Sequence, residues 1–190
     1  MNTLFSHVCV VTMDDRMSVW TDAFVGVTDG KISWLSKHAP EEKPDQIIDA
    51  TGMVLMPGLI NCHTHLPMQL LRGYADDLKL QEWLNDYIFP REDRLDGRCV
   101  RAATTLAVAE CLKFGVTSVS DMYYFCDDIC DVIAKSGMKA NISRGTSMFL
   151  GDDFDFEKFP ACQELVALKE KWHNYDGGRI KIEASIHAEY

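Results

Sequence analysis

Two histidines, His63 and His65, are separated by a single residue and follow directly after the largely apolar run 54–62. On an extended strand, residues i and i+2 point to the same side, so the two imidazoles would stand close enough to bind one metal ion. An isolated His-X-His pair can also arise by chance, without a metal. Here an apolar strand, bounded by Pro57 and Pro67, delivers two polar rings at its end, and this context favours a metal site.

Four further residues could contact a substrate. Glu92, in the charged run 91–94, could accept two hydrogen bonds from a vicinal diol or could be a solvated surface carboxylate. Arg144, at the end of a predicted strand, could pair bidentately with a carboxylate or could be an ordinary surface arginine. His187 ends the last predicted strand, with a satisfied core histidine as the alternative, and Trp83 could contact a substrate or only hold its loop.

The elements before this site are short strands. Asp29-Gly30 between two apolar segments is typical of a two-residue hairpin turn. The first fifty residues therefore predict a small antiparallel β-layer. Its predicted strands are 8–12, 23–28, 31–36 and 46–49.

After Gly52 the pattern changes to alternating strands and helices, which predicts a parallel sheet covered by helices. The predicted strands are 54–62, 116–122, 138–143 and 179–187, and the predicted helices are 98–114, 127–135 and 157–172. Either an open doubly wound sheet or part of a (β/α)8 barrel fits this order. A full barrel needs about 250 residues, so four strands would be about half of one.

The composition narrows the class of protein. The chain has 190 residues and a formal net charge of −10, which argues against a nucleic-acid partner, because such proteins present basic patches. Its seven cysteines are scattered and indicate a reducing compartment. We find no signal peptide and no apolar run long enough to span a membrane, so we expect a cytoplasmic protein with no membrane partner.

The segment from Pro57 to His65 resembles the first barrel strand of the amidohydrolase superfamily. Within that superfamily, the chain is most similar to the 5'-methylthioadenosine/S-adenosylhomocysteine deaminases, whose relatives include triazine chlorohydrolases and guanine deaminases. The resemblance implies a metal-dependent (β/α)8 barrel of the TIM type, with a β-sandwich formed by both chain ends. It continues through 71–77, 83–84, 88–92, 115–117, 121–123 and 186–190.

The resemblance also implies roles for the residues. His63 and His65 would bind the metal, and His187 would contact the substrate beside it and take part in catalysis. Glu92 would hold the ribose hydroxyls, and Arg144 would bind the carboxylate of S-adenosylhomocysteine. The end of the fourth strand, 185–189, lacks the bridging lysine of the binuclear members, so we expect one metal per subunit. Zn²⁺ is the expected metal, although another divalent ion would also serve.

These features together predict a hydrolytic deaminase of adenosine-type thioethers, including 5'-methylthioadenosine, S-adenosylhomocysteine, 5'-deoxyadenosine or adenosine itself. A hydroxide generated at the metal would attack C6 of the adenine ring, and ammonia would leave. The alternatives are a related enzyme acting on a guanine or triazine ring, and a non-catalytic half-barrel. The full-length protein is expected to be a homo-oligomer that binds a nucleoside.

The expected organisation is a part of the β-sandwich over 1–55 and the first half of the barrel over 56–190. The remaining metal ligands and the acid/base residues would lie beyond Tyr190. A half-barrel leaves its first and fourth strands as open edges, and exposes the inner faces of apolar strands such as 54–62 and 180–186. We therefore expect residues 1–190 alone to associate or stay partly unfolded, and to lack activity.

Overall fold

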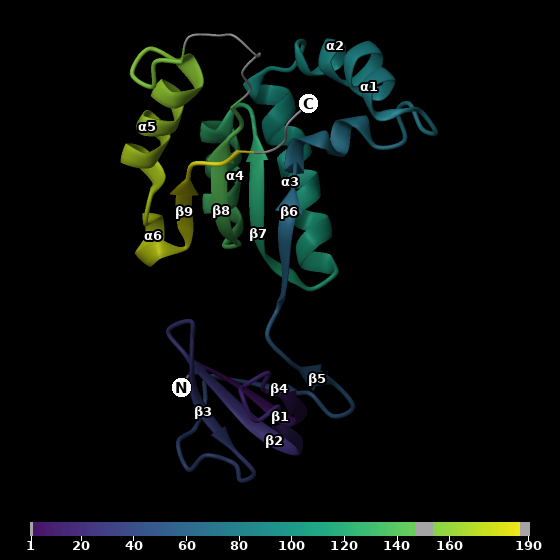
Figure 1. The fold of residues 1–190 in the computed structure, drawn as a ribbon. Helices are drawn as coiled ribbons and strands as arrows, with labels where there is room; N and C mark the ends of the chain where they lie inside the picture. Colours follow the sequence, from purple (N-terminus) through teal and green to yellow (C-terminus); the bar gives the residue numbers. More distant parts are fainter. Residues whose placement is uncertain (1, 147–153, 187–190) are drawn as a thin grey trace. The chain divides into compact units, whose positions relative to one another are not determined.

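The computed structural model describes residues 2–146 and 154–186, and the chain divides between Pro57 and Gly58 into two compact units (Figure 1). The sequence placed this boundary two residues earlier, after residue 55. Val54 and Leu55, which form a short strand paired with β1, belong to the first unit in both divisions, so only residues 56 and 57 change sides.

The first unit is a five-stranded sheet in the order β3-β2-β1-β4, with β5 also paired to β1. The strands are β1 (Thr3–Val11), β2 (Val19–Thr28), β3 (Lys31–Ser36), β4 (Gln46–Asp49) and β5 (Val54–Leu55). The predicted hairpin between β2 and β3 is confirmed, and Asp29 and Gly30 both have the positive φ that a type I′ turn requires.

The expectation of an entirely antiparallel layer is wrong. β4 and β5 run parallel to β1, whereas β2 runs antiparallel to both β1 and β3. A strand that runs parallel to its neighbour needs a crossover connection. The connection from β3 to β4 is long enough to carry the chain back to the side of β1 that β2 does not occupy. The buried core of this unit is small and consists of Val8, Val10, Ala23, Val25 and Ala50.

The second unit contains a four-stranded, fully parallel sheet in the order β6-β7-β8-β9. Its strands are β6 (Leu59–Thr64), β7 (Val116–Tyr123), β8 (Lys139–Arg144) and β9 (Ile180–Glu183). The long helices are α3 (Gly97–Lys113), α4 (Cys126–Ser136) and α5 (Pro160–Trp172). The predicted alternation of strand and helix is therefore confirmed. β9 is shorter than predicted, and His187 lies outside the described residues.

Short helices complete this unit. Between β6 and α3 the chain forms η1 (Leu66–Leu71), α1 (Leu80–Glu82), the π-helix η2 (Trp83–Ile88) and α2 (Phe89–Glu92), and α6 (Tyr175–Gly178) precedes β9. In the part of the chain that the structure describes, no helix has the length and apolar character needed to cross a membrane.

The two faces of the parallel sheet differ in chemistry. Helices α3 and α4 lie behind the strands in Figure 1, and α5 packs against β8 and β9. The side chains that point toward the helices form one buried apolar core, which includes Val119, Ala140, Ile142, Ile180 and Ile182. Alternate residues point to the opposite face, which is largely polar. Its residues include Ser118, Ser120, Asn141, Lys181 and Glu183.

For residues 180–183, this arrangement corrects the expectation that the inner face of 180–186 is apolar, whereas Ile186 is 94% exposed as expected. Ile180 and Ile182 are 0% and 5% exposed because they pack against the helices, and the hydrophilic Lys181 and Glu183 take the other face. The expectation holds better for β6, where Leu59 and Ile60 are 54% and 67% exposed.

Gly58 brings the start of β6 into close contact with β7. A Cβ atom at this position would overlap the side chain of Thr117, so a larger residue would push β6 away from β7. The amide of Leu59 donates to the carbonyl of Gly115 at 2.8 Å and closes the same junction. The start of β6 is therefore fixed against its neighbour, and the histidines lie at its other end.

Candidate metal and substrate site

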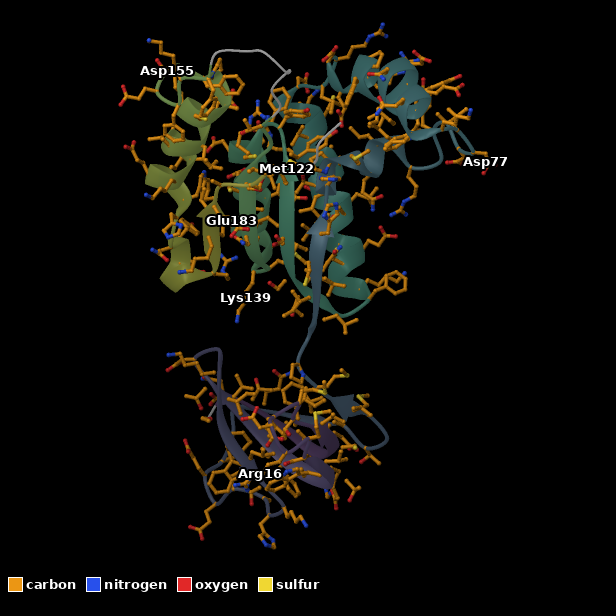
Figure 2. All side chains as sticks on the ribbon, viewed as in Figure 1. Arg16, Asp77, Met122, Lys139, Asp155 and Glu183 are labelled. Carbon is orange, nitrogen blue, oxygen red and sulfur yellow. The ribbon has the colours of Figure 1, made fainter. Side chains whose placement is uncertain are left out.

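His63 lies on β6 and His65 follows it directly, so both rings project where the parallel strands end. The ring centroids are 5.1 Å apart and the ring planes make an angle of 77°. The two rings line a cavity of about 150 Å³ with residues of all four strands or the segments that follow them, among them Met122, Ser143 and Glu183 (Figure 2, where Met122 and Glu183 are labelled). The structure thus brings the predicted pair together on the polar face.

A backbone carbonyl fixes the tautomer of His65. Its Nδ1 lies 2.6 Å from the carbonyl oxygen of Met122 on β7. Because a carbonyl only accepts, Nδ1 carries the proton and donates, and Nε2 keeps the lone pair that a metal ligand needs. A ligating imidazole held by a carbonyl through its other nitrogen is the usual arrangement in metal sites.

The turn after His65 is held by a buried carboxyl group. The amide of Leu66 donates to Asp121 Oδ1 at 2.6 Å, and Asp121 is only 1% exposed. Burial raises the pKa of Asp121 to about 7, although the Leu66 amide acts in the opposite direction. Asp121 Oδ2 has no hydrogen-bond partner among the described residues. The end of β7 therefore holds the histidine segment at two points, Asp121 and the Met122 carbonyl.

The chemistry of this pair fits a divalent metal. Two adjacent imidazoles, one with a defined tautomer, can supply two ligands to zinc, which usually takes four. Within residues 2–146 and 154–186 no group of three or more His, Cys, Asp or Glu side chains is placed to hold a metal. The described residues can thus contribute only part of a coordination sphere.

Glu92, at the end of α2, is half-buried and bound to a tyrosine. The Tyr123 hydroxyl donates to Glu92 Oε1 at 2.5 Å, and the Tyr123 ring centroid lies 6.2 Å from that of His65. Burial raises the pKa of Glu92, while the hydrogen bond from Tyr123 and the proximity of His65 lower it. Tyr123 thus joins Glu92 to the histidine pair, so Glu92 is not a fully solvated surface residue.

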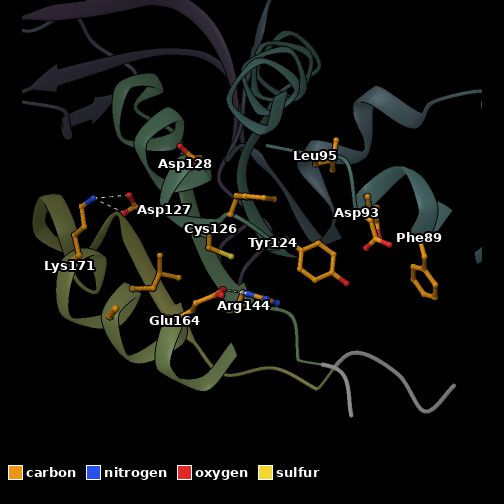
Figure 3. A pocket seen from close by; sticks show the side chains of 14 residues that line it. Phe89, Asp93, Leu95, Tyr124, Cys126, Asp127, Asp128, Arg144, Glu164 and Lys171 are labelled. Carbon is orange, nitrogen blue, oxygen red and sulfur yellow. Dashed lines mark hydrogen bonds and ion pairs between the residues drawn. The ribbon is translucent and has the colours of Figure 1, made fainter. Parts of the chain in front are cut away.

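Arg144 ends β8 and is held on several sides. Its Nε donates to Glu164 of α5, its Nη1 donates to the carbonyl of Gly145, and its guanidinium lies 4.9 Å from the centre of the Tyr124 ring. Arg144 and Glu92 line the same cleft, which has a volume of about 940 Å³ (Figure 3). The structure therefore places two of the predicted substrate residues in one cavity.

The other two predicted residues are less closely tied to this site. Trp83 begins the π-helix η2 and is half-buried, but it lines neither the small cavity nor the cleft. His187 lies outside the described residues. Their substrate contacts therefore stay predictions.

Three residues were missed from the sequence: Asp121, Tyr123 and Glu164. Asp121 and Tyr123 lie on the same side of β7 as the apolar Val119, at i+2 and i+4. This spacing was a usable sign that both are buried against the helices. A carboxyl group and a phenol on a buried face need partners, and this requirement could have linked them to the site. Nothing in the sequence links Glu164 to Arg144, twenty residues earlier.

A parallel sheet with alternating helices, and two imidazoles at the carboxyl ends of its strands, defines this protein as an α/β protein with a candidate metal site. The chain belongs to the amidohydrolase family, whose family model matches residues 54–190.

The similarity to individual relatives also covers the residues before position 54. The chain is 34% identical to a 5-methylthioadenosine/S-adenosylhomocysteine deaminase of Acetivibrio thermocellus, over 100% of this chain and 44% of the relative. It is 37% identical to a protein of the same name from Syntrophomonas wolfei, over 100% of this chain and 43% of the relative. It is 38% identical to a 5'-deoxyadenosine deaminase of Methanosarcina acetivorans, over 97% of this chain and 42% of the relative. The chain thus spans less than half the length of these relatives.

Solved structures show the same fold. An adenosine deaminase from Xanthomonas campestris with bound zinc matches with a TM-score of 0.84 and 30% identity, over 98% of this chain and 43% of that chain. An atrazine chlorohydrolase from Arthrobacter aurescens, complexed with zinc, matches with a TM-score of 0.85 over 96% of this chain and 46% of that chain. Its identity is 21%, so this second match supports the fold alone.

Proposed function

We propose that the complete protein carrying this sequence is a metal-dependent hydrolytic deaminase of adenosine-type thioethers. The observation that carries this proposal is the 34–38% identity to 5-methylthioadenosine/S-adenosylhomocysteine and 5'-deoxyadenosine deaminases over nearly all of the chain. The substrates are 5'-methylthioadenosine, S-adenosylhomocysteine, 5'-deoxyadenosine or adenosine. Solved triazine and guanine enzymes with this fold match at 18–23% identity, and give no comparable support.

The fold has a place in this proposal. The parallel sheet of β6, β7, β8 and β9 is the first half of a (β/α)8 barrel, and the first unit is part of a β-sandwich that later strands complete. Two observations support this: the match to less than half of each relative, and the position of the histidine pair at the carboxyl ends of the parallel strands, where (β/α)8 enzymes carry their active sites. The catalytic site then belongs to the closed barrel, with ligands that this chain does not supply.

His63 and His65 would hold one divalent metal, zinc in the first instance. When bound, such a metal lowers the pKa of water towards 7 and supplies the Lewis acidity for hydrolysis at C6 of adenine, with release of ammonia. Met122 contributes by holding the His65 tautomer through its carbonyl. Asp121 contributes by fixing the Leu66 peptide, and with it the backbone that carries the ring.

The substrate would lie with its ribose at Glu92. Tyr123 donates to one oxygen of this carboxylate, so the carboxylate is oriented and its remaining lone pairs can accept from the two ribose hydroxyls. The 5' substituent would extend into the cleft toward Arg144, past the aromatic and aliphatic side chains of Phe89, Leu95 and Tyr124. His187 would orient the adenine ring beside the metal.

The test is an assay of the complete protein with defined metal content. We expect about one zinc per subunit by elemental analysis, and ammonia release from 5'-methylthioadenosine, S-adenosylhomocysteine or 5'-deoxyadenosine. Treatment with a chelator should abolish turnover, and added Zn²⁺ should restore it. Turnover of guanine or atrazine without turnover of any adenosine compound would overturn the substrate assignment, and full activity of the metal-free protein would overturn the mechanism.

A further inference from the structure

The cleft that contains Glu92 and Arg144 is predominantly acidic. Its charged lining comprises five carboxyl groups and two cations: Glu92, Asp93, Asp127, Asp128, Glu164, Arg144 and Lys171. A site built only for a carboxylate tail would have the opposite balance, since like charges near an anionic ligand oppose its binding. The excess of carboxyl groups points to a ligand that also carries positive charge.

Most of these charges already have partners within the protein. Lys171 Nζ donates to both carboxylate oxygens of Asp127, at 2.7 and 2.9 Å. Asp128 pairs with Arg101, which lies outside the cleft lining. The pair of Arg144 and Glu164 lies between the end of β8 and α5, and both groups line the cleft (Figure 3).

Arg144 is the fixed member of this pair. Its side chain is 15% exposed, the carbonyl of Gly145 accepts from it, and the ring of Tyr124 lies over its guanidinium. The hydrogen bonds to Gly145 and Glu164 use two of the five N–H donors that a guanidinium carries. A rigid, partly engaged guanidinium is suited to receive a carboxylate at its remaining edge.

Glu164 is the accessible member. Its side chain is 56% exposed, and only Oε2 contacts Arg144. The second oxygen of the carboxylate can accept from a donor in the cleft. A cation fixed beside an accessible anion matches the charge pattern of an α-amino acid, which carries a carboxylate and an ammonium group on one carbon atom.

We propose that Glu164 binds the ammonium group of a zwitterionic α-amino acid on the substrate, next to Arg144, the expected partner of its carboxylate. The inference rests on the proposed function, because it takes the ribose to lie at Glu92 and the 5' substituent to extend along the cleft. Glu164 thereby becomes a specificity-determining residue. It favours thioethers that end in an amino acid over those that end in a methyl group or in a carboxylate alone.

The experiment compares S-adenosylhomocysteine with 5'-methylthioadenosine as substrates of the complete, metal-loaded protein. The ratio of interest is kcat/KM for S-adenosylhomocysteine divided by kcat/KM for 5'-methylthioadenosine. Glu164→Gln should lower this ratio by about tenfold, because one exposed charge-assisted hydrogen bond is lost, and the change should lie mainly in KM. Glu170→Gln is the matched control, since it removes the same charge from an exposed position of α5 that is not in the cleft lining. An unchanged ratio in Glu164→Gln would overturn the proposal. A raised ratio would also overturn it, because Glu164 would then compete with the substrate carboxylate for Arg144.

Calorimetric binding gives a second test that depends on neither turnover nor a variant. The ligands are S-adenosylhomocysteine, its analogue without the amino group and its analogue without the carboxylate. Tighter binding of the zwitterion than of both analogues supports the paired site, even if the protein deaminates none of them and the proposed function fails. Equal binding of all three, in a protein that deaminates 5'-methylthioadenosine, removes the paired site and leaves the proposed function intact.

Discussion

The two faces of the parallel sheet are made by the same four strands but carry different chemistry. On the helix side, Ile142 and Ile180 are fully buried in a continuous apolar core. On the other side lie serines, an asparagine, a lysine and a glutamate, and the histidine pair stands at the end of that face. Along each strand, the residues that face the helices stabilise the fold, and the residues between them face the candidate site. Substitutions on the two faces should therefore have separable effects.

Two residues cross this division. Asp121 and Tyr123 belong to the helix side by parity, yet their polar atoms bond to Leu66 and Glu92, which flank or form the site. The buried face therefore supplies both the apolar core and the polar groups that hold the site from behind. Substitutions on each face can therefore test whether the two contributions are separate.

The largest expected effect is that of His63→Ala. A group that only orients a metal ligand typically contributes 10–100-fold to activity or affinity, so loss of a ligand should lower kcat/KM of the complete protein by more than about a hundredfold. Zinc content should fall with it, while the melting temperature of the metal-free protein should change little, because His63 is not part of the buried apolar core. His38→Ala, at an exposed position of the first unit, is the control. Retention of both zinc and activity in His63→Ala would show that His63 is not a metal ligand.

Ile142→Ala tests the other face. Its side chain is fully buried, so removal of its methyl and methylene groups should lower the free energy of unfolding by about 2–5 kcal/mol. Zinc content per folded molecule should be unchanged. Urea denaturation measures the loss, and Ile32→Ala, at a 73% exposed position, should cost less than about 0.5 kcal/mol. Similar losses at the two positions would show that the helix-side core is not the main source of stability.

Glu92→Gln should damage turnover of the nucleoside more than metal binding. The loss of one charge-assisted hydrogen bond to the ribose costs about 1.5–3 kcal/mol, at least roughly tenfold in kcat/KM. Wild-type protein should also use a 2',3'-dideoxy nucleoside much less well than the parent. Glu82→Gln, at an exposed position of α1, is the control for loss of charge. An effect below about threefold would count against the ribose role.

The smallest expected effect is that of Tyr123→Phe, which removes one hydroxyl from the buried face. The lost hydrogen bond to Glu92 should cost about 1 kcal/mol, near fivefold in KM. Because that bond lowers the pKa of Glu92, its removal should raise the pKa, and the acid limb of the pH–KM profile should move to higher pH. Tyr87→Phe, at a half-buried tyrosine of η2, should leave the acid limb in place. An unshifted limb in Tyr123→Phe would show that Tyr123 does not tune Glu92.

Local patterns in the sequence were sufficient for much of the fold. Helical spacing predicted α3 to within a residue at each end, and Asp29-Gly30 predicted the hairpin of β2 and β3. The apolar run 54–62 was misread as one strand, because periodicity cannot show that residues 54–55 pair with β1 in the first unit and residues 59–64 with β7 in the second. The parallel direction of β4 was missed for the same reason, since strand direction depends on the tertiary path of the chain.

The site divides in the same way. His63 and His65 were recognisable because their spacing is local, and i, i+2 neighbours on a strand meet without any help from the fold. The contacts of Glu92 with Tyr123 and of Arg144 with Glu164 join residues 31 and 20 positions apart. Such contacts depend on how α2 and α5 pack at the strand ends, and no local spacing encodes that packing.

The atom that orients His65 belongs to the backbone of residue 122, and its side chain takes no part in that hydrogen bond. Substitution at this position cannot delete the carbonyl. The orientation of the ring should therefore tolerate mutational drift at residue 122 for as long as the register of β6 against β7 is kept. A survey of variants for activity would pass over this position, although its carbonyl group is within 2.6 Å of the ring. Only a change that shifts the strands, such as a bulky residue in place of Gly58, would reveal it.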